Sequence, residues 1–152
     1  MLTPYEIVDA TEADLPILER IENTCFLAPW NREQILYEIK HNPVSNFWVI
    51  KVNGMVIGFS DYWNTFDSGT IAQIAILPEY QRHHFGSVLM EEILKDCVAE
   101  KVVCLTLEVR KGNLKAIAFY EKFGFKQILV KPHYYSNGED AIYMIKNVEA
   151  SK

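Results

Sequence analysis

Residue types that could do chemistry gather in three segments of the second half of the chain. The first segment, residues 77–87, reads LPEYQRHHFGS and has the pattern of a strand end, a short turn and the start of a helix. Such a junction directs free backbone amides and the positive end of the helix dipole at one point, which is how many proteins hold a pyrophosphate. It lacks the residues of a Walker loop and of the dinucleotide fingerprint. Because an ordinary strand-to-helix turn has the same pattern, both interpretations stay open.

His83 and His84 in this segment raise the question of a metal site. Neighbouring side chains point apart on a helix or turn, and no third ligand lies at a metal-binding spacing. The cysteines, Cys25, Cys97 and Cys104, are odd in number and unrelated in spacing, and each has apolar neighbours. We therefore expect solvated histidines, reduced cysteines in the core and no metal site.

The second segment contains Glu108 near the carboxyl end of a predicted strand, residues 102–109. Alternation of period two places Leu105, Leu107 and Val109 on one face of this strand and Glu108 on the other. Functional groups of open sheets often gather at such strand ends. A surface carboxylate, or one paired with a nearby basic side chain, would give the same pattern, so spacing does not decide between these interpretations.

The third segment is a predicted helix over residues 114–123, which contains Tyr120. Ala116, Tyr120 and Phe123 share one face of this helix. That placement favours a core tyrosine whose hydroxyl group is satisfied by a hydrogen bond. Taken alone, Tyr120 therefore indicates packing rather than chemistry.

The elements that must position these segments follow from hydrophobic periodicity, turn residues and helix caps. In the first half we expect a strand at 7–8, a helix capped by Thr11 that runs to about residue 24, a short helix after the capping pair Asn31 and Gln34, and strands at 47–52, 55–60 and 70–77. In the second half we expect a helix over 85–99, a strand over 102–109, a helix over 114–123, and strands from 125 and over 141–146. Hairpins combined with crossover helices predict an α+β fold, a mixed central sheet flanked by helices.

Two of the connections are specified by residue type. Asn53-Gly54 supplies the positive φ angles that a type I′ hairpin turn requires, so residues 47–60 are predicted to form a hairpin. Asn113 is predicted to cap the helix that begins at residue 114, and Gly124 stands where a left-handed residue would end that helix.

Length and composition limit the class of protein. The chain has 152 residues, of which 49% are hydrophobic and 23% charged, which fits a single globular domain over residues 1–152. Its formal net charge of -5 argues against a broad nucleic-acid-binding face and favours a basic partner. The N-terminus has no leader pattern, and no segment has the length and apolarity needed to cross a bilayer. We therefore expect a cytoplasmic protein that binds neither nucleic acid nor membrane.

The three segments together resemble the GNAT N-acetyltransferases. The runs that carry the resemblance are residues 74–86 (IAILPEYQRHHFG), residues 107–110 (LEVR), and Asn113 with residues 116–125 (AIAFYEKFGF). The resemblance covers nearly the whole chain and implies the GNAT fold, in which two central strands splay apart. Residues 22–30 and 134–144 are similar to the ribosomal-protein-alanine N-acetyltransferase (RimI-type) branch of this family.

The resemblance implies an acetyl-CoA site in the opening between the splayed strands. It pairs the pantetheine arm with the strand segment formed by Ile74, Ala75 and Ile76, and it makes Asn113 a cofactor contact. It assigns the pyrophosphate to the backbone amides of six consecutive residues, which are Arg82, His83, His84, Phe85, Gly86 and Ser87.

One residue of this loop departs from the family pattern. The phosphate loop of the family has the form Gln/Arg-x-x-Gly-x-Gly/Ala, and His84 occupies its first glycine position. A backbone amide is still present at that position. If the position requires a left-handed conformation, histidine adopts it only at a cost in free energy.

The resemblance also implies roles in a direct attack of an amine on the thioester. Glu108 corresponds to the general base, and Tyr120 corresponds to the acid that protonates the leaving CoA thiolate. Trp30, Tyr134 and Tyr135 would line the acceptor cleft.

The pKa values of amines favour a protein N-terminus as the acceptor. An α-amino group with a pKa of about 7.7–8.0 is roughly one-tenth neutral at about pH 7, whereas a lysine with a pKa of about 10.4 is neutral in about one molecule in a few thousand. One carboxylate base suffices for the α-amine. By the resemblance, the acceptor would be the N-terminal alanine of a small-subunit ribosomal protein. The alternatives are the same chemistry on a small amine or a lysine side chain, and a non-catalytic acyl-CoA-binding module.

Overall fold

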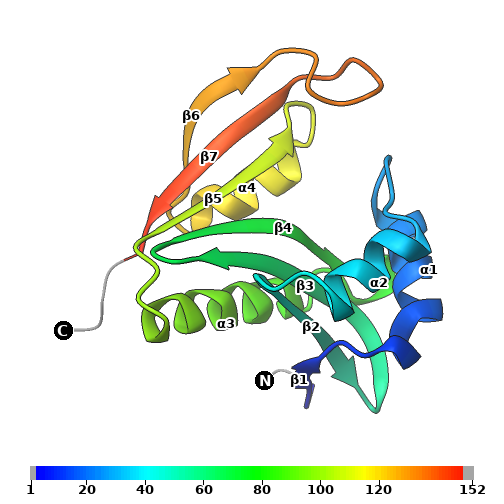
Figure 1. The fold of residues 1–152 in the computed structure, drawn as a ribbon. Coiled ribbons are helices and arrows are strands. Elements are labelled where there is room, and N and C mark those ends of the chain that lie inside the picture. The colour runs from blue at the N-terminus through cyan, green and yellow to red at the C-terminus, as the bar shows by residue number, and fades with distance from the viewer. Residues whose placement is uncertain (1–2, 149–152) are drawn as a thin grey trace.

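The structure is a computed structural model that describes residues 3–148. Its strands form one mixed sheet in the order β1-β2-β3-β4-β5-β7-β6 (Figure 1). The strands are β1 (Glu6–Asp9), β2 (Ser45–Val52), β3 (Met55–Thr65), β4 (Ser68–Ile76), β5 (Cys104–Arg110), β6 (Lys126–Lys131) and β7 (Ala141–Asn147). The α-helices are α1 (Leu15–Cys25), α2 (Arg32–Lys40), α3 (Phe85–Ala99) and α4 (Leu114–Lys122), and the short 3-10 helices are η1 (Glu12–Asp14) and η2 (Pro78–Tyr80). The predicted α+β fold with a mixed sheet is confirmed.

The helices cover both faces of the sheet. Ala75 of β4 belongs to a buried cluster that includes Leu18 of α1 and Ile35 of α2. Its neighbour Ile76 belongs to a different buried cluster, which includes Leu89 of α3. Because successive side chains of a strand point to opposite faces, α1 and α2 lie on one face of the sheet and α3 lies on the other.

The first half of the sheet is an antiparallel meander. β2 and β3 pair through the predicted turn, in which Asn53 and Gly54 have φ angles of 53° and 77°. β4 then returns antiparallel to β3. The hairpin prediction is therefore confirmed, because the turn residues alone supply the backbone conformation that a tight hairpin requires.

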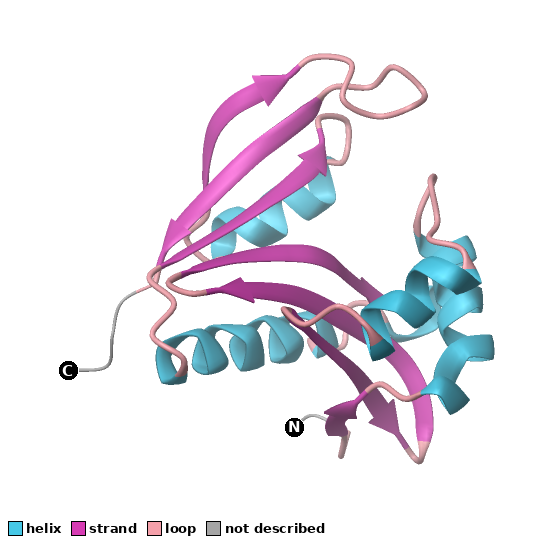
Figure 2. Cartoon of the chain, in the orientation of Figure 1, coloured by secondary structure: helices cyan, strands magenta, loops and turns pink. Residues whose placement is uncertain are grey.

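The central strands β4 and β5 stay together over a short length. Their parallel pairing joins Ser68–Thr70 to Cys104–Thr106, and no further pair between them occurs within residues 3–148. Immediately afterwards β4 has a bulge, because Tyr62 and Asp61 of β3 face Ile71 and Gln73, which leaves Ala72 as an extra residue. A bulge bends its strand and strengthens the local twist. The two strands therefore diverge toward their carboxyl ends (Figure 2).

The helix that follows β5 has the ends that its sequence specifies. The Asn113 side chain accepts a hydrogen bond from the backbone amide of Ala116 at 3.2 Å, and the helix runs from Leu114 to Lys122. Gly124 has a φ of +92°, as expected for the residue that ends the helix. The predicted limits of α3 also hold, from Phe85 to Ala99.

Several predicted element limits are wrong, and the largest difference is at β3, which runs to Thr65 rather than ending at residue 60. Thr11 is the N-cap residue as predicted, but the first turn after it is the 3-10 turn η1, because Pro16 has no N–H with which to continue an α-helical ladder back to Glu12. β5 begins at Cys104 rather than at 102, because the amides of Val102 and Val103 bond to Cys97 and Asp67 in the preceding connection.

A buried pair of carboxyl groups links α2 to β2 and β3. Asp61 is 0% exposed and accepts a hydrogen bond from Ser45 Oγ at 2.6 Å. Glu38 accepts hydrogen bonds from Trp63 Nε1 at 2.6 Å and from Asn42 Nδ2 at 2.8 Å. Burial, followed by the nearby Glu38 carboxyl, raises the pKa of Asp61 to about 9. Asp61 is therefore protonated in the folded protein at neutral pH.

This proton makes stability depend on pH. Between the unfolded pKa of Asp61, 3.8, and its folded pKa of about 9, the folded state holds a proton that the unfolded state has released, so stability falls as pH rises through this window. In wild type, the free energy of unfolding should fall by on the order of 1 kcal/mol per pH unit across this window, and Asp61→Asn should reduce this slope. Urea unfolding at about pH 5 and pH 8 measures it, with the exposed Asp67→Asn as control. Equal slopes for wild type and Asp61→Asn would contradict this assignment.

Candidate active site

The divergence of β4 and β5 opens a cavity of about 780 Å³. The cavity is lined by Thr70–Ile76 of β4 and by Leu107–Arg110 of β5. Helix α4 contributes Ala116 and Tyr120 to its lining. The predicted site residues that line this cavity are Ile74, Ala75, Ile76, Glu108, Asn113, Tyr120, Trp30, Tyr134 and Tyr135. One cavity thus brings together residues that are distant in the sequence.

Glu108 lies on the cavity face of β5, as the alternation predicts. Its strand neighbours Leu105, Leu107 and Val109 are at most 6% exposed and pack in the core. The carboxylate accepts a hydrogen bond from Lys131 Nζ at 3.1 Å in a partly exposed ion pair. The ion pair that the sequence analysis gave as one interpretation is therefore present, and Glu108 also lines the cavity.

Tyr120 is buried in α4 and also lines the cavity. Its ring packs edge-on against Phe119 and Phe125, with ring centroids 5.4 Å and 5.8 Å away. Burial, followed by the nearby Tyr135, raises the pKa of Tyr120 well above its ordinary value. Tyr120 is thus the core tyrosine expected from its helix face, and its hydroxyl group remains a proton donor throughout the neutral range.

The loop between β6 and β7 forms one rim of the cavity. The pKa of Tyr134 is raised to about 12, first by its hydrogen bond to the Glu108 carboxylate and then by burial. Tyr134 and Tyr135 stack edge-on at a centroid distance of 5.1 Å. The Lys131 Nζ atom lies 5.3 Å from the centroid of the Tyr134 ring. The tyrosine pair, the carboxylate and the lysine therefore form one connected group.

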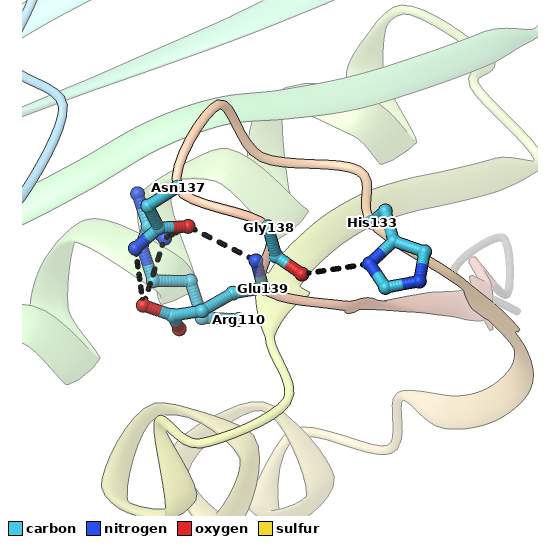
Figure 3. A network of polar contacts seen from close by, with 5 residues as sticks. All are labelled: Arg110, His133, Asn137, Gly138 and Glu139. Carbon is cyan, nitrogen blue, oxygen red and sulfur yellow. Dashed lines mark hydrogen bonds and ion pairs between the residues drawn. The ribbon is translucent and has the colours of Figure 1, made fainter.

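A polar network ties this loop to the end of β5 (Figure 3). The Arg110 guanidinium lies 4.1 Å from the centroid of the Tyr135 ring, and its Nη1 is 3.4 Å from Glu139 Oε1. Within the loop, Asn137 Oδ1 accepts from the Glu139 amide at 3.0 Å. Sequence reasoning missed Arg110 and Glu139 as site residues. The available signal was that Arg110 lies two residues after Glu108 and so shares its strand face.

The opposite rim is the segment that joins α1 to α2. Cys25, Phe26, Leu27, Ala28 and Trp30 line the cavity, and we call this segment the acceptor wall. Behind it lies Glu22 of α1, whose Oε1 accepts hydrogen bonds from the Trp30 amide at 2.9 Å and from Gln73 Nε2 at 3.2 Å. Sequence reasoning missed Gln73, which also lines the cavity.

The cysteines differ from the expectation that all three belong to the core. Cys97 is buried, whereas Cys25 and Cys104 are only half-buried, and all three are free thiols. Cys25 is more exposed because it ends α1 at the edge of the cavity.

The rest of the predicted cofactor segment lines a second cavity of about 590 Å³ at the start of α3. Arg82, His83, His84 and Ser87 line it, together with Lys122 from the end of α4. Gly86 faces Phe119 instead, and Phe85 is 3% exposed in the core. Phe85 therefore offers no side chain to this cavity and Gly86 has none, so only their backbone amides remain available to a ligand.

The helix α3 begins on strained backbone. His84 is its N-cap residue and has a φ of 66° and a ψ of 11°, which is the left-handed conformation. Arg82 has a φ of 67°. The position that holds glycine in the family pattern thus requires a left-handed residue here, and histidine meets that requirement with a strain on the order of 1 kcal/mol.

Within residues 3–148, no group of three or more His, Cys, Asp and Glu side chains could hold a metal ion. None of the helices described by the structure has the length and apolarity to span a membrane.

The chain is similar to known proteins over most of its length. Residues 15–125 match the model of the acetyltransferase (GNAT) family. The chain is 33% identical over 132 residues to a putative ribosomal protein bS18-alanine N-acetyltransferase of Bacillus subtilis, covering 86% of this chain and 87% of the relative. It is 34% identical over 134 residues to the Escherichia coli K12 ribosomal protein bS18-alanine N-acetyltransferase, covering 86% and 89%. The crystal structure of the E. coli ribosomal-protein-S18-alanine N-acetyltransferase superposes with a TM-score of 0.88 at 29% identity, covering 98% of this chain and 97% of that one.

The strain at His84 generates a prediction about stability. Glycine adopts a positive φ without a Cβ clash, so His84→Gly should stabilise the fold by about 1 kcal/mol. His83 is the matched control, because its φ is not positive and glycine there should destabilise. Thermal or urea unfolding of both variants measures the difference. Destabilisation by both substitutions would show that the left-handed backbone carries no such strain.

Proposed function

We infer that this chain, which belongs to the acetyltransferase (GNAT) family, transfers the acetyl group of acetyl-CoA to the N-terminal alanine of a small-subunit ribosomal protein. The observation that carries the proposal is the single cavity between β4 and β5, which has Glu108 on one side, Tyr120 below and rims from two separate loops. That arrangement places a candidate base and a candidate acid beside one channel that is open to a protein terminus.

The cavity has the features that an acetyl-CoA site requires. Beyond Thr70, the edge of β4 that faces β5 has no strand partner within residues 3–148. The Ile76 oxygen accepts a hydrogen bond from Gln81 Nε2 at 3.0 Å, and we expect the other backbone groups of this edge to be available to the amides of a pantetheine arm. The first turn of α3 has amides without intrahelical partners, and Arg82, His83 and Lys122 add positive or protonatable side chains. When bound, acetyl-CoA supplies a reactive thioester. We assign the pantetheine to Ile74, Ala75, Ile76 and Asn113, and the pyrophosphate to the amides of residues 82–87.

We assign Glu108 as the general base. A neutral amine attacks the thioester carbon, which forms the new C–N bond, and the proton that the nitrogen then loses passes to the Glu108 carboxylate. Lys131 at 3.1 Å and the Tyr134 hydroxyl hold this carboxylate in place from the β6–β7 side. Glu108 is therefore a fixed proton acceptor on the wall of the cavity.

We assign Tyr120 as the general acid. When the C–S bond breaks, the sulfur leaves as a thiolate, and the Tyr120 hydroxyl can donate a proton to it. The raised pKa of Tyr120 keeps the proton on its oxygen in the resting protein, so the hydroxyl group is available as a hydrogen-bond donor to the developing thiolate. A buried hydroxyl stabilises such a charge more strongly than an exposed one would.

The two rims are suited to a peptide terminus. Trp30 of the acceptor wall lines the same cavity as the tyrosine pair Tyr134 and Tyr135, and Glu108 and Glu139 add carboxylates to it. Carboxylates attract an ammonium group and a basic chain, and the net charge of -5 acts in the same direction. The relatives named above are ribosomal protein bS18-alanine N-acetyltransferases, which supports the same acceptor here. We extend the proposal to one N-acetyltransferase domain over residues 1–152, working in the cytoplasm.

The catalytic assignment is tested by conservative substitutions. Glu108→Gln should lower kcat by about 10²- to 10⁴-fold and Tyr120→Phe by about 10²-fold, because each removes one proton transfer and keeps the shape of the side chain. Steady-state acetylation of an Ala-starting peptide measures both, with Glu121→Gln on the exposed side of α4 as control. Full activity of Glu108→Gln would remove Glu108 from the mechanism.

The acceptor assignment is tested by competition between amines. Peptides that begin with Ala should be acetylated faster than lysine peptides or polyamines, and ribosomal proteins from cells without the gene should lack one N-terminal acetyl group in mass spectra. Failure of every N-terminal peptide would contradict the assignment. If acetyl-CoA raised Tm but no amine were acetylated, the chain would instead be an acyl-CoA-binding module.

A further inference from the structure

The buried carboxyl group of Glu22 has no role in the proposed reaction. Glu22 belongs to α1 and is 0% exposed. Its Oε1 accepts two hydrogen bonds, from the Trp30 amide and from Gln73 Nε2. Its Oε2 has no partner, and neither has the buried Oε1 of Gln73. Both of these atoms are oxygens, so neither can donate to the other unless one carries a proton.

A proton on Glu22 would satisfy both oxygens at once. A carboxylic acid and a primary amide form two parallel hydrogen bonds, one from the amide N–H to the acid carbonyl oxygen and one from the acid O–H to the amide oxygen. The first bond is present between Gln73 Nε2 and Glu22 Oε1, at 3.2 Å. The two unpartnered oxygens are the atoms of the second bond.

We propose that Glu22 is a positioning residue whose protonated carboxyl group forms a two-bond acid–amide pair with Gln73 and so fixes the acceptor wall against β4. The wall has a further contact with the same strand, because Cys25 Sγ lies 3.5 Å from the backbone oxygen of Ile76. Glu22 holds the other end of the wall through Trp30. The proposal rests on the proposed function, in that the wall is taken to bind the acceptor peptide.

The surroundings of Glu22 favour the neutral acid. Burial raises its pKa to about 7, although the hydrogen bonds from Trp30 and Gln73 act in the opposite direction. Its titratable neighbour is Cys25, whose own pKa is raised by burial and then by the charges of Glu22 and Glu79. The basic side chains on α1 and α2 are engaged elsewhere, since Arg20 lies 3.8 Å from Glu79 and Arg32 lies 2.7 Å from Glu19.

Loss of this proton should loosen the wall near neutral pH. The folded pKa of about 7 is above the unfolded value of 4.5, so the stability that the proton contributes is complete below about pH 4.5 and is lost as pH rises through 7. Above that pH, the Glu22 carboxylate and the Gln73 oxygen repel each other. The acceptor wall should then be held less firmly, whereas the helix start that binds the cofactor should be unaffected.

The first experiment tests the proton independently of catalysis. In wild-type protein labelled with 13C at glutamate carboxyl groups, the signal that disappears in Glu22→Gln should titrate with a midpoint near pH 7. The Tm of Glu22→Gln minus that of wild type should increase from about pH 5 to pH 8, because the amide stays neutral. Glu19→Gln, one turn earlier on α1, removes the same charge from the ion pair with Arg32 and should show no such trend. A midpoint near 4.5, or a constant difference in Tm, would overturn the proposal.

The second experiment tests the positioning role. We divide the peptide KM of wild type by the peptide KM of Glu22→Gln, because this ratio cancels the ionisation of the peptide itself. The ratio should be near one at about pH 6 and should rise by up to about tenfold at about pH 8. The KM for acetyl-CoA should not change. Glu22→Ala should raise peptide KM at both pH values. A ratio that does not vary with pH would overturn the positioning role.

Absence of all peptide acetylation would overturn the proposed function, and the titration would still decide whether the acid–amide pair exists.

Discussion

The short pairing between β4 and β5 is the constraint on which the rest of the structure depends. Parallel strands that separate after Ser68–Thr70 leave backbone groups and a gap in the middle of a sheet, where a protein of this size would otherwise place its densest core. The bulge at Ala72 makes the separation possible, because the extra residue bends β4 away while its pairing with β3 continues. The cavity, the free strand edge and the access to Glu108 and Tyr120 all follow from it.

Three carboxyl groups of the fold are alike in chemistry and differ in environment. Glu108 is partly exposed beside the cavity and is paired with Lys131. Asp61 is fully buried next to another carboxyl group, and burial raises its pKa to about 9. Glu22 lies between these cases, with a pKa of about 7. Burial and the available donors therefore separate one partly exposed carboxylate from two buried carboxyl groups.

Both rims of the cavity are loops held by polar contacts. On the β6–β7 side, Arg110 reaches from β5 to the ring of Tyr135 and to Glu139. On the other side, Glu22 reaches from α1 to Trp30 and Gln73. A strand and a helix thus hold Glu108 and Tyr120, the proposed reacting groups, and side chains of neighbouring elements hold the two loops in place. This division is consistent with an enzyme that must fix its chemistry and still admit a flexible peptide terminus.

Sequence alone determined the order of the elements and several local conformations of this protein, although not all of the element limits. Asn53-Gly54 specified a hairpin, Asn113 and Gly124 specified the ends of α4, and the alternation around Glu108 specified which face the carboxylate occupies, because turns, caps and periodicity act over a few residues. The runs around Glu108 and Tyr120 were also enough to identify the family. Only the tertiary structure decided that Glu22 meets Gln73, which lies 51 residues away, and that Arg110 meets Glu139. The protonation of buried carboxyl groups was likewise undetermined by sequence, because it depends on burial and on partners that only the folded chain brings together.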